Sequence, residues 1–392
     1  MATKPRTISA LVAVVGAAMT LLTATPASAA FTDVPAKYWA ASAIREVALE
    51  RTWLQDYGTS LFRPEELLSR RHLARAVVLA FAASDQVDPA ITFTDLPSSD
   101  PGYRFANVAV KRGWMTAPGG QFLPGGTVTK VDLDRALIRA LGLGAEIGGL
   151  DAIKTADGAA LQHPDGFAEL VLAQQLGLHY NHPGSAEIRE LLPATAVRRS
   201  DAAYALWRAW TARGTYRITA LQRYRSIVLP AMTPTRRRVV EFALSYAGYP
   251  YLYAGEWHTK TPRKYCCGAQ PQGGFDCSGF AWWVLKKPAD GYDNTKVRPY
   301  AGWRLRERSS RHMAQATKTK LSLRQTRPTD LLLFDGDGGK SWRGVDHAGL
   351  ALGGGWMIHS SSGRDGVSID WVRQGWYKDR FVWARRVVPV NA

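Results

Sequence analysis

The spacing of apolar and polar residues predicts helices in the front half of this chain and a mixture of helices and strands in the rear half. Residues 40–53 and 71–82 are typical of helices. Ser69 is placed to cap the second one, and Thr129 is placed to cap a later helix. In the rear half, Thr233-Pro234 supplies a cap and a first-turn proline for an amphipathic helix over residues 236–246. A second helix, apolar on every side, is predicted to begin directly after Cys277.

A predicted hairpin carries two histidines on adjacent strands. Short strands flank Gly353-Gly354-Gly355, one carrying His347 and the other His359. A three-residue glycine turn would place Leu352 opposite Trp356, so that the two histidines share a face as diagonal neighbours. A two-residue turn would put them on opposite faces. Their cooperation therefore requires the longer turn or a bulge.

A repeat with a period of about sixty residues runs through the front half. Residues 31–35 recur at 93–97, both beginning Phe-Thr-Asp, and the Phe-x-Pro segment at 62–64 recurs at 122–124. A third, degenerate copy near 165–210 lacks the Phe-x-Asp opening. Each copy is predicted to form a helix, a loop and a second helix.

A basic residue stands six places after one proline in each copy, at Arg70, Lys130 and Arg199. These features resemble the S-layer-homology family, although no copy matches its Thr-Arg-x-Glu-like segment fully. In that family three repeats form a trefoil of helices that binds secondary wall polymers. The resemblance implies an anionic polymer ligand for residues 30–212, for which the three basic residues are suited. A helical module whose aromatic residues are only core is the alternative.

The first residues are predicted to be a leader rather than part of the fold. Lys4 and Arg6 precede an apolar run over residues 8–22, and Ala27-Ser28-Ala29 is a small-residue cleavage pattern. The run is shorter than the roughly 20 apolar residues of a membrane span. We therefore expect residues 1–29 to be a signal peptide, and a secreted product without a membrane span.

The charge balance bears on partners. The 392-residue chain has a formal charge of +17, which falls to +15 without Lys4 and Arg6. Such a surface attracts polyanions. An exported protein meets wall polymers and carboxylate-rich peptidoglycan first, so no nucleic-acid partner is expected.

The cysteines point to a free thiol. Three cysteines leave one over however the others pair, and Cys266 and Cys267 are adjacent while Cys277 stands apart. At the start of a helix, unpaired amides and the helix dipole favour a thiolate. A thiolate nucleophile needs a base, and that base needs a third group to orient it. His347 and His359 supply these two roles, whereas taken singly each residue could be an ordinary thiol, surface or core residue.

This constellation resembles the NlpC family of papain-like cell-wall peptidases over about 155 of the 392 residues. The family's Asp-Cys-Ser-Gly motif is intact at residues 276–279, and its Gly-Asp-Leu strand corresponds to residues 328–334. Its histidine and third polar residue fall on His347 and His359. Residues 256–273, with two cysteines, are longer than the family usually has at that place.

The resemblance implies a fold, a reaction and further site residues. The fold is α+β: a papain-like small antiparallel sheet with the cysteine-bearing helix packed against it, preceded here by an all-α repeat domain. The reaction is hydrolysis of the bond between the side-chain carboxyl of D-glutamate and a diamino acid in peptidoglycan stem peptides. Tyr251 corresponds to a tyrosine beside the active site, and Asp276 and Ser278 correspond to positions that contact the stem peptide in some members. No metal and no cofactor are implied.

The sequence therefore predicts a signal peptide (1–29), three wall-binding repeats (30–212), a packed connector (213–233) and a cysteine peptidase (234–392) that acts in association with the cell wall. Two alternatives stay open. The same cysteine and histidine could serve an amidase or acyltransferase, since fold does not fix function. A non-catalytic wall-binding protein would be indicated by loss of the cysteine or histidine, and neither is missing.

Overall fold

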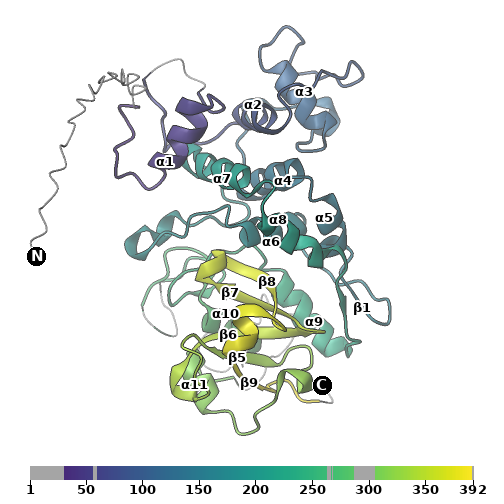
Figure 1. Ribbon diagram of the computed structural model, residues 1–392, viewed down its shortest axis with the longest axis vertical. Coiled ribbons are helices and arrows are strands. Elements are labelled where there is room, and N and C mark those ends of the chain that lie inside the picture. The colour runs from purple at the N-terminus through teal and green to yellow at the C-terminus, as the bar shows by residue number, and fades with distance from the viewer. Residues whose placement is uncertain (1–30, 56–59, 263–265, 267, 287–304, 391–392) are drawn as a thin grey trace, which may run out of the picture.

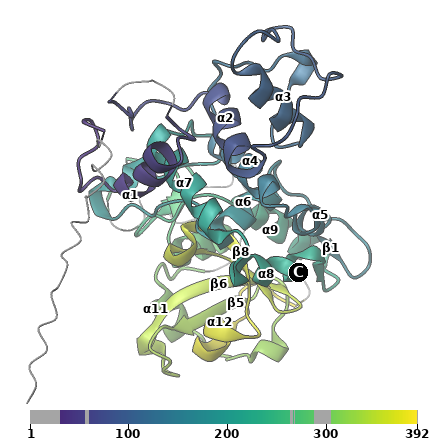
Figure 2. The same cartoon turned by 45° about the horizontal axis from the view of Figure 1, so that its top comes forward.

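The computed structural model describes residues 31–55, 60–262, 266, 268–286 and 305–390. The predicted signal peptide and Cys267 lie outside these residues. Figure 1 shows a group of helices at one end of the molecule and a sheet at the other, with α6 between the outer helices and the sheet. The turned view in Figure 2 shows the same order.

In the described part of the front module, residues 31–55 and 60–212, the regular elements are helices except for one two-residue strand. Its elements are α1 (Ala41–Ile44), the π-helix η1 (Arg45–Glu50), α2 (Arg70–Phe81), α3 (Tyr103–Lys111), η2 (Pro118–Gly120), α4 (Lys130–Ala140), α5 (Gly144–Asp151), β1 (Lys154–Thr155), α6 (Phe167–Leu176), η3 (Gly184–Arg189) and α7 (Arg199–Ala212).

The predicted helix starts are confirmed. The side chain of Ser69 accepts a hydrogen bond from the backbone N–H of His72 at the start of α2. Thr129 and Asp132 form a capping box at the start of α4. The helix predicted over residues 40–53 is shorter, because α1 and η1 together end at Glu50.

The Phe-x-Asp and Phe-x-Pro segments of one copy bind each other. The carboxylate of Asp33 accepts from the backbone N–H groups of Phe62 and Arg63, at 2.9 and 2.6 Å. Arg63 has a φ of +59°, which a side chain other than glycine rarely adopts. The carboxylate therefore fixes a strained turn, and the second copy repeats the arrangement with Asp95, Phe122 and Leu123.

The three copies close into a cycle. The backbone N–H of Arg71 in α2 donates to the carbonyl of Pro124 in the second copy, at 3.0 Å. Val131 in α4 donates to Pro193 in the third copy, and Ser200 in α7 donates back to Pro64 in the first, each also at 3.0 Å. The start of each second helix is thus held by the proline turn of the next copy.

The basic residues after each proline have a structural role. Arg199 is fully buried, and its guanidinium donates to the carbonyls of Phe62 and Leu54, at 2.8 and 2.9 Å. Lys130 is 2% exposed and pairs with Asp134 at 3.0 Å. The expectation that these residues face a polymer ligand is therefore wrong for Lys130 and Arg199, because neither charge reaches the surface.

The connector packs between the two modules. It contains α8 (Tyr216–Ala220), η4 (Leu221–Arg225) and β2 (Val228–Leu229). Strand β2 pairs in parallel with β1 of the front module. The hydroxyl of Tyr224 donates to the carbonyl of Ile369 at 2.7 Å, so the connector is also bound to the rear module.

The rear module is an α+β domain, as predicted. Its elements are α9 (Pro234–Leu244), β3 (Glu256–Trp257), β4 (Gly274–Phe275), α10 (Cys277–Leu285), α11 (Ser310–Gln315), η5 (Leu323–Gln325), β5 (Leu331–Asp335), η6 (Trp342–Gly344), β6 (Val345–Gly353), β7 (Trp356–Ser361), η7 (Ser362–Arg364), β8 (Gly366–Trp371), α12 (Gly375–Arg380) and β9 (Phe381–Arg385). The five-stranded sheet has the order β8-β7-β6-β5-β9, and every neighbouring pair is antiparallel.

Helix α10 is buried along its whole length and packs on β6 and β7. This placement confirms the expected packing of the cysteine-bearing helix on the sheet. Helix α9 begins as predicted, with Thr233 accepting from Arg236 and Pro234 in the first turn. Strand β8 is an edge strand, and α6 of the front module packs against it. One hydrophobic core is continuous across the two modules.

Candidate active site

Cys277 occupies the first position of α10. The preceding residue, Asp276, caps the helix by accepting from the backbone N–H of Gly279 at 2.5 Å. The Sγ atom lies 3.6 Å from the carbonyl oxygen of Asp346, so the nucleophile lies beside the strand that carries His347. Cys266 is disulfide-bonded, and Cys277 is the free thiol among the described residues.

The hairpin brings His347 and His359 together by the second of the two predicted routes, a bulge, and not by a three-residue turn. The turn contains two residues, Gly354 and Gly355, and Trp356 pairs with Gly353 instead of Leu352. A bulge between Ala351 and Gly353 shifts the register by one residue, which cancels the effect of the shorter turn. The Nε2 atom of His347 consequently lies 2.7 Å from Nδ1 of His359.

The chain of polar contacts continues beyond the two histidines. His359 is completely buried, and its Nε2 atom lies 3.0 Å from Oδ2 of Asp370 on β8. Arg364 donates to both oxygens of Asp370, from Nη2 at 2.9 Å and from Nε at 3.2 Å. Burial raises the pKa of Asp370, but the Arg364 charge and the His359 hydrogen bond outweigh it and leave that pKa far below its usual value. Asp370 is therefore an anion.

The anion fixes which ring nitrogens carry protons. An ionised carboxylate only accepts hydrogen bonds, so Nε2 of His359 must donate to Asp370. When the His359 ring carries a single proton, its Nδ1 is an acceptor and takes the N–H of His347 Nε2. Nδ1 of His347 is left with a lone pair. We call Cys277, His347, His359 and Asp370 the relay: Cys277 and His347 line one cavity, and the two histidines and Asp370 are joined by the contacts above.

The thiol and the base are both neutral at rest. Burial and the charge of Asp276 raise the pKa of the Cys277 thiol to about 12, although the backbone N–H groups of Ala348 and Ser278 lower it. Burial, with the charge of His359, holds the pKa of His347 well below its usual value. The expectation of a thiolate favoured by the helix start is therefore wrong for the resting state, because burial outweighs the amides. Attack by this thiol would require a base to take its proton.

Cys277 lines a cavity with a volume of about 390 Å³. A second cavity, of about 410 Å³, lies at the boundary between the two modules. The smaller cavity, which we call the cleft, is lined by Tyr251, Cys277, Asp346, His347, Ser361, Ser362, Gly363, Trp376 and Tyr377. Burial raises the pKa of Tyr251, so its hydroxyl stays a donor. The side chain of Trp376 is 48% exposed at the cleft. The cleft thus offers hydroxyl groups, an aromatic surface and one carboxylate.

Two of the residues predicted to contact the substrate, Asp276 and Ser278, form hydrogen bonds with another side chain of the protein. Arg308 donates to both oxygens of Asp276, at 3.1 and 3.0 Å, and to the hydroxyl of Ser278 at 2.9 Å. The same guanidinium pairs with the buried carboxylate of Glu256. The structure therefore places Tyr251 in the cleft, while Asp276 and Ser278 lie beside it and bind Arg308.

Sequence reasoning missed Asp370 and Arg308. Asp370 lies in the strand after the hairpin, two residues beyond Ser368, which pairs with His359. Alternation along that strand could have placed an acidic residue on the histidine face. Arg308 immediately precedes Ser309, the cap of α11, and no periodic pattern marks it.

The described residues contain no group of three or more His, Cys, Asp and Glu side chains placed to hold a metal ion. Nor does any helix in the described part of the chain have the length and apolar character needed to cross a membrane.

Comparison with known proteins locates the rear module in a family. Residues 248–386 match the model of the NlpC/P60 family. The bifunctional muramidase/DL-endopeptidase CwlT of Bacillus subtilis is 28% identical over 149 residues, which cover 38% of this chain and 36% of CwlT. The probable endopeptidase p60 of Listeria grayi is 31% identical over 133 residues, covering 34% of this chain and 22% of that protein.

A solved structure, the NlpC/p60 domain of the peptidoglycan hydrolase SagA, is 28% identical and is matched over 39% of this chain and 98% of its own, with a TM-score of 0.25. The chain spans well under half the length of the two curated relatives above. The family model does not extend to the helical module. The similarity to the NlpC/P60 family is thus carried by residues 248–386.

Proposed function

We propose that this protein is a secreted cysteine endopeptidase that cuts peptidoglycan stem peptides between the side-chain carboxyl of D-glutamate and a diamino acid. The observation that carries the proposal is the relay, which ends on a free thiol in an open cleft. The NlpC/P60 match and the endopeptidase names of the relatives support the choice of bond.

The relay residues perform acyl transfer in two stages. Nδ1 of His347 takes the thiol proton while Sγ of Cys277 attacks the carbonyl carbon of the scissile amide. The tetrahedral intermediate collapses when His347 returns that proton to the leaving amine, which leaves a thioester on Cys277. Water then attacks the thioester and gives its proton to His347, and that proton finally returns to Sγ.

His359 and Asp370 stabilise the charge that passes through His347. When His347 becomes an imidazolium, its Nε2–H donates more strongly to His359, whose own Nε2–H is held by the Asp370 anion. The helix start supports the developing oxyanion, since the first backbone N–H groups of a helix have no acceptor inside it. The Tyr251 hydroxyl is a further donor in the cleft.

The cleft fits a substrate that carries a free ammonium group. Asp346 is exposed at the cleft and follows directly on the strand from Val345. A diamino acid keeps a second amino group after one has formed the amide, and an ammonium group is attracted to a carboxylate. The serine hydroxyls at 361 and 362 can accept or donate hydrogen bonds to the peptide backbone.

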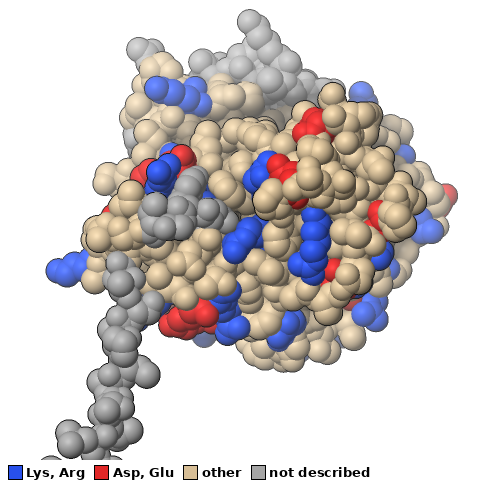
Figure 3. Space-filling view, turned by 90° about the horizontal axis from the view of Figure 1, so that it is seen from above, with Lys and Arg blue, Asp and Glu red and all other residues tan. Residues whose placement is uncertain are grey.

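The helical module is proposed to hold the enzyme on the wall. Figure 3 shows lysine and arginine side chains spread over the face seen from above, with acidic side chains beside several of them. The formal charge of +17 belongs to the chain as a whole and favours attraction of the whole protein to an anionic polymer, whereas residues 31–212 contain 18 lysines and arginines against 20 acidic residues. Since Lys130 and Arg199 are buried, binding must use other, exposed cations of residues 31–212.

Digestion of purified peptidoglycan tests the proposed function. The protein without residues 1–29 should release fragments whose masses show a new D-glutamate carboxyl and a new amino group on the diamino acid. The Cys277→Ala variant, in which only the nucleophile is lost, should release none. Cleavage at another amide would favour an amidase or acyltransferase, and wall binding without any cleavage would favour a non-catalytic protein.

A further inference from the structure

The helical module reaches the buried end of the relay. Gln175, near the end of α6, places its Nε2 atom 3.2 Å from Oδ2 of Asp370, 3.2 Å from the hydroxyl of Ser368 and 2.9 Å from the carbonyl of Ile369. We propose that Gln175 is a positioning residue of the relay, supplied by the helical module, so that the reactivity of Cys277 depends on that module. The inference rests on the proposed catalytic role of the relay and adds a residue from outside the NlpC/P60 domain.

The acceptor sites of Asp370 show why this amide matters. Oδ2 lies near three donors: Nε2 of His359 at 3.0 Å, Nε2 of Gln175 at 3.2 Å and Nε of Arg364 at 3.2 Å. Oδ1 accepts from Nη2 of Arg364 at 2.9 Å. A buried carboxylate needs all its acceptor sites filled to stay ionised and fixed in direction. Gln175 and Arg364 therefore hold the oxygen on which His359 depends.

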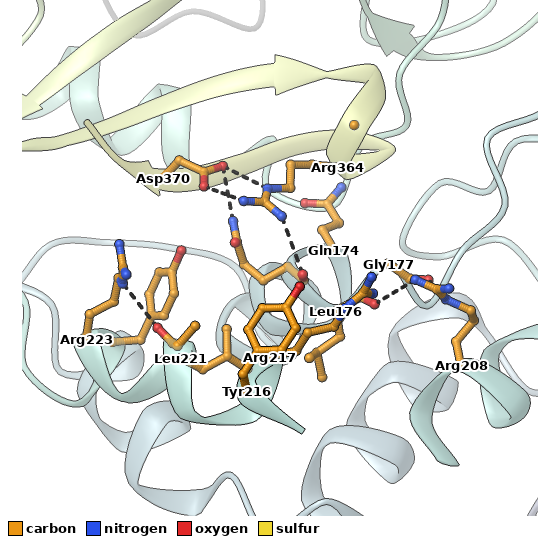
Figure 4. Close-up of a pocket in the computed structure, with 14 residues that line it drawn as sticks. Gln174, Leu176, Gly177, Arg208, Tyr216, Arg217, Leu221, Arg223, Arg364 and Asp370 are labelled. Atoms are coloured by element: carbon orange, nitrogen blue, oxygen red, sulfur yellow. Dashed lines mark hydrogen bonds and ion pairs between the residues drawn. The ribbon is translucent and has the colours of Figure 1, made fainter. Parts of the chain in front are cut away.

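The placement of Gln175 follows from the way the modules meet. Strand β8 is the edge of the sheet, and an edge strand presents unpaired carbonyls. The carbonyl of Ile369 on that edge accepts both from Gln175 and from the hydroxyl of Tyr224 in the connector. Arg364 also donates to the backbone carbonyl of Gln175 at 3.5 Å. Figure 4 shows Asp370, Arg364 and the neighbouring end of α6 meeting at this point.

A cavity beside Gln175 determines how strongly loss of its amide should affect the relay. Gln175, Arg364 and Asp370 line the 410 Å³ cavity at the module boundary, together with arginines from α7, α8 and η4. Water from this cavity can reach Asp370 if the amide is removed, and it can replace part of the lost hydrogen bond. Loss of the amide should therefore weaken the relay without abolishing it.

Few groups near Asp370 change charge in the usual pH range. The charged and titratable groups that interact with it are Arg364 on η7, His359 on β7, His347 on β6, Tyr377 on α12 and Tyr224 on η4, and Arg223 lines the same cavity. Burial raises the pKa of both tyrosines, and the Asp370 charge raises the pKa of Arg364 despite its burial. An acid introduced at position 175 would thus be a new titrating group beside the relay.

The test compares Gln175→Met with Gln174→Met in the otherwise complete chain. Both residues lie on α6 at the module boundary, but the Gln174 amide points to the carbonyl of Asp365, at 3.5 Å, and not to Asp370. The readout is the rate at which iodoacetamide alkylates Cys277 as a function of pH. Gln175→Met should slow alkylation near pH 7 about tenfold, as expected for loss of one hydrogen bond to a charged group. Gln174→Met should alkylate at the parent rate.

The Gln175→Glu variant gives a signature that a structural role alone would not produce. A protonated glutamic acid can donate to Asp370, whereas an ionised one repels it. The alkylation rate relative to the parent should therefore be near one at acidic pH and fall as pH rises. Parent-like alkylation by Gln175→Met, or a pH-independent ratio for Gln175→Glu, would overturn the proposal.

The alkylation assay needs no substrate, so it separates this inference from the proposed function. If the parent fails to cut wall peptides while both Gln175 variants behave as described, the assigned reaction is wrong and the inter-module relay stands. If wall peptides are cut but Gln175→Met alkylates like the parent, the endopeptidase stands and the role of Gln175 is wrong.

Discussion

Arg308 binds both carboxylate oxygens of Asp276, the residue directly before the nucleophile, at 3.1 and 3.0 Å. Only 9% of the Arg308 side chain is exposed, and its Nε also meets the fully buried carboxylate of Glu256. One guanidinium thus compensates two acids and fixes the start of α10. The planar guanidinium group of arginine has several N–H donors and can bind two carboxylates at once, which the single ammonium group of lysine does less well.

Replacing Arg308 should therefore lower both stability and activity. Arg308→Ala leaves the charges of Asp276 and Glu256 uncompensated, and removal of one partner of a buried ion pair costs about 3 kcal/mol or more. The stability and activity of Arg308→Lys should lie between those of the parent and Arg308→Ala, because lysine keeps the positive charge but lacks the several N–H donors of the guanidinium group. Urea unfolding followed by circular dichroism measures the change. Arg311→Ala, at an exposed position of α11, the helix that begins two residues after Arg308, is the matched control and should unfold like the parent.

The two histidines should differ in the depth of their effects. His347→Ala should lower kcat by about a thousandfold or more, since both proton transfers pass through that ring. His359→Asn or His359→Gln should retain a measurable fraction, because an amide can still accept the hydrogen bond from Nε2 of His347. Hydrolysis of peptidoglycan fragments at saturating substrate measures both.

Alkylation of Cys277 supplies the control for these variants, since it reports thiol deprotonation without substrate. His347→Ala should slow alkylation at neutral pH, because the thiol, with a pKa of about 12, then has no base. Equal and total loss from both histidine changes, or alkylation that ignores His347, would contradict the assigned roles.

A pair of buried acids at the module boundary should make stability fall as pH rises. Glu190 and Asp365 share a hydrogen bond, and burial raises the pKa of Glu190 to about 8 from the ordinary value of 4.5. The folded protein therefore holds a proton that the unfolded chain releases above its ordinary pKa. The stability from this proton is complete below pH 4.5 and is lost as pH rises toward 8.

Glu190→Gln should accordingly gain stability relative to the parent, by about 2 kcal/mol, between about pH 6 and pH 8, since the amide stays neutral throughout. Thermal unfolding at several pH values measures the difference. Glu187→Gln, on the neighbouring η3 turn and less buried, serves as the comparison. A constant difference between Glu190→Gln and the parent at all pH values would show that the proton is not held there.

Wall binding should be ionic and independent of catalysis. The Cys277→Ala protein should sediment with purified walls at about 0.05 M salt and be released as salt approaches about 0.5 M, because ions screen exposed charges. The Cys277→Ala protein is used because the parent would digest the walls during the measurement. Failure to sediment at low salt would leave the helical module as a scaffold only.

The sequence was informative where one local pattern determines the structure. The caps at Ser69, Thr129 and Thr233 and the start of α10 at Cys277 depend on neighbouring residues, and the structure has them as predicted. The hairpin histidines lie on one face as the hypothesis required, but through a bulge near Leu352 that compensates for a two-residue turn. A short glycine run permits several turn types, so sequence alone could not choose among them.

Contacts between distant segments could not be predicted in the same way. Arg308 joins Asp276 across 32 positions, and Gln175 joins Asp370 across 195. Only the packing of α6 on the sheet edge brings the second pair together. The burial of Lys130 and Arg199 likewise results from closure of the three copies, whereas isolated basic residues after a turn are typical of a solvated surface.

The hydrogen bond from Ser200 back to Pro64 has a consequence for how the helical module comes apart. In an open stack of repeats the terminal copies have one neighbour each, so they fray first, and the stack can lengthen by adding copies. Here the last copy is joined to the first, and every copy has two neighbours. Removing any copy would break two junctions at once, so the module should melt as one cooperative unit. A fourth copy could be added only by opening the ring. Ring closure therefore fixes the size of the helical module, which carries Gln175 on α6.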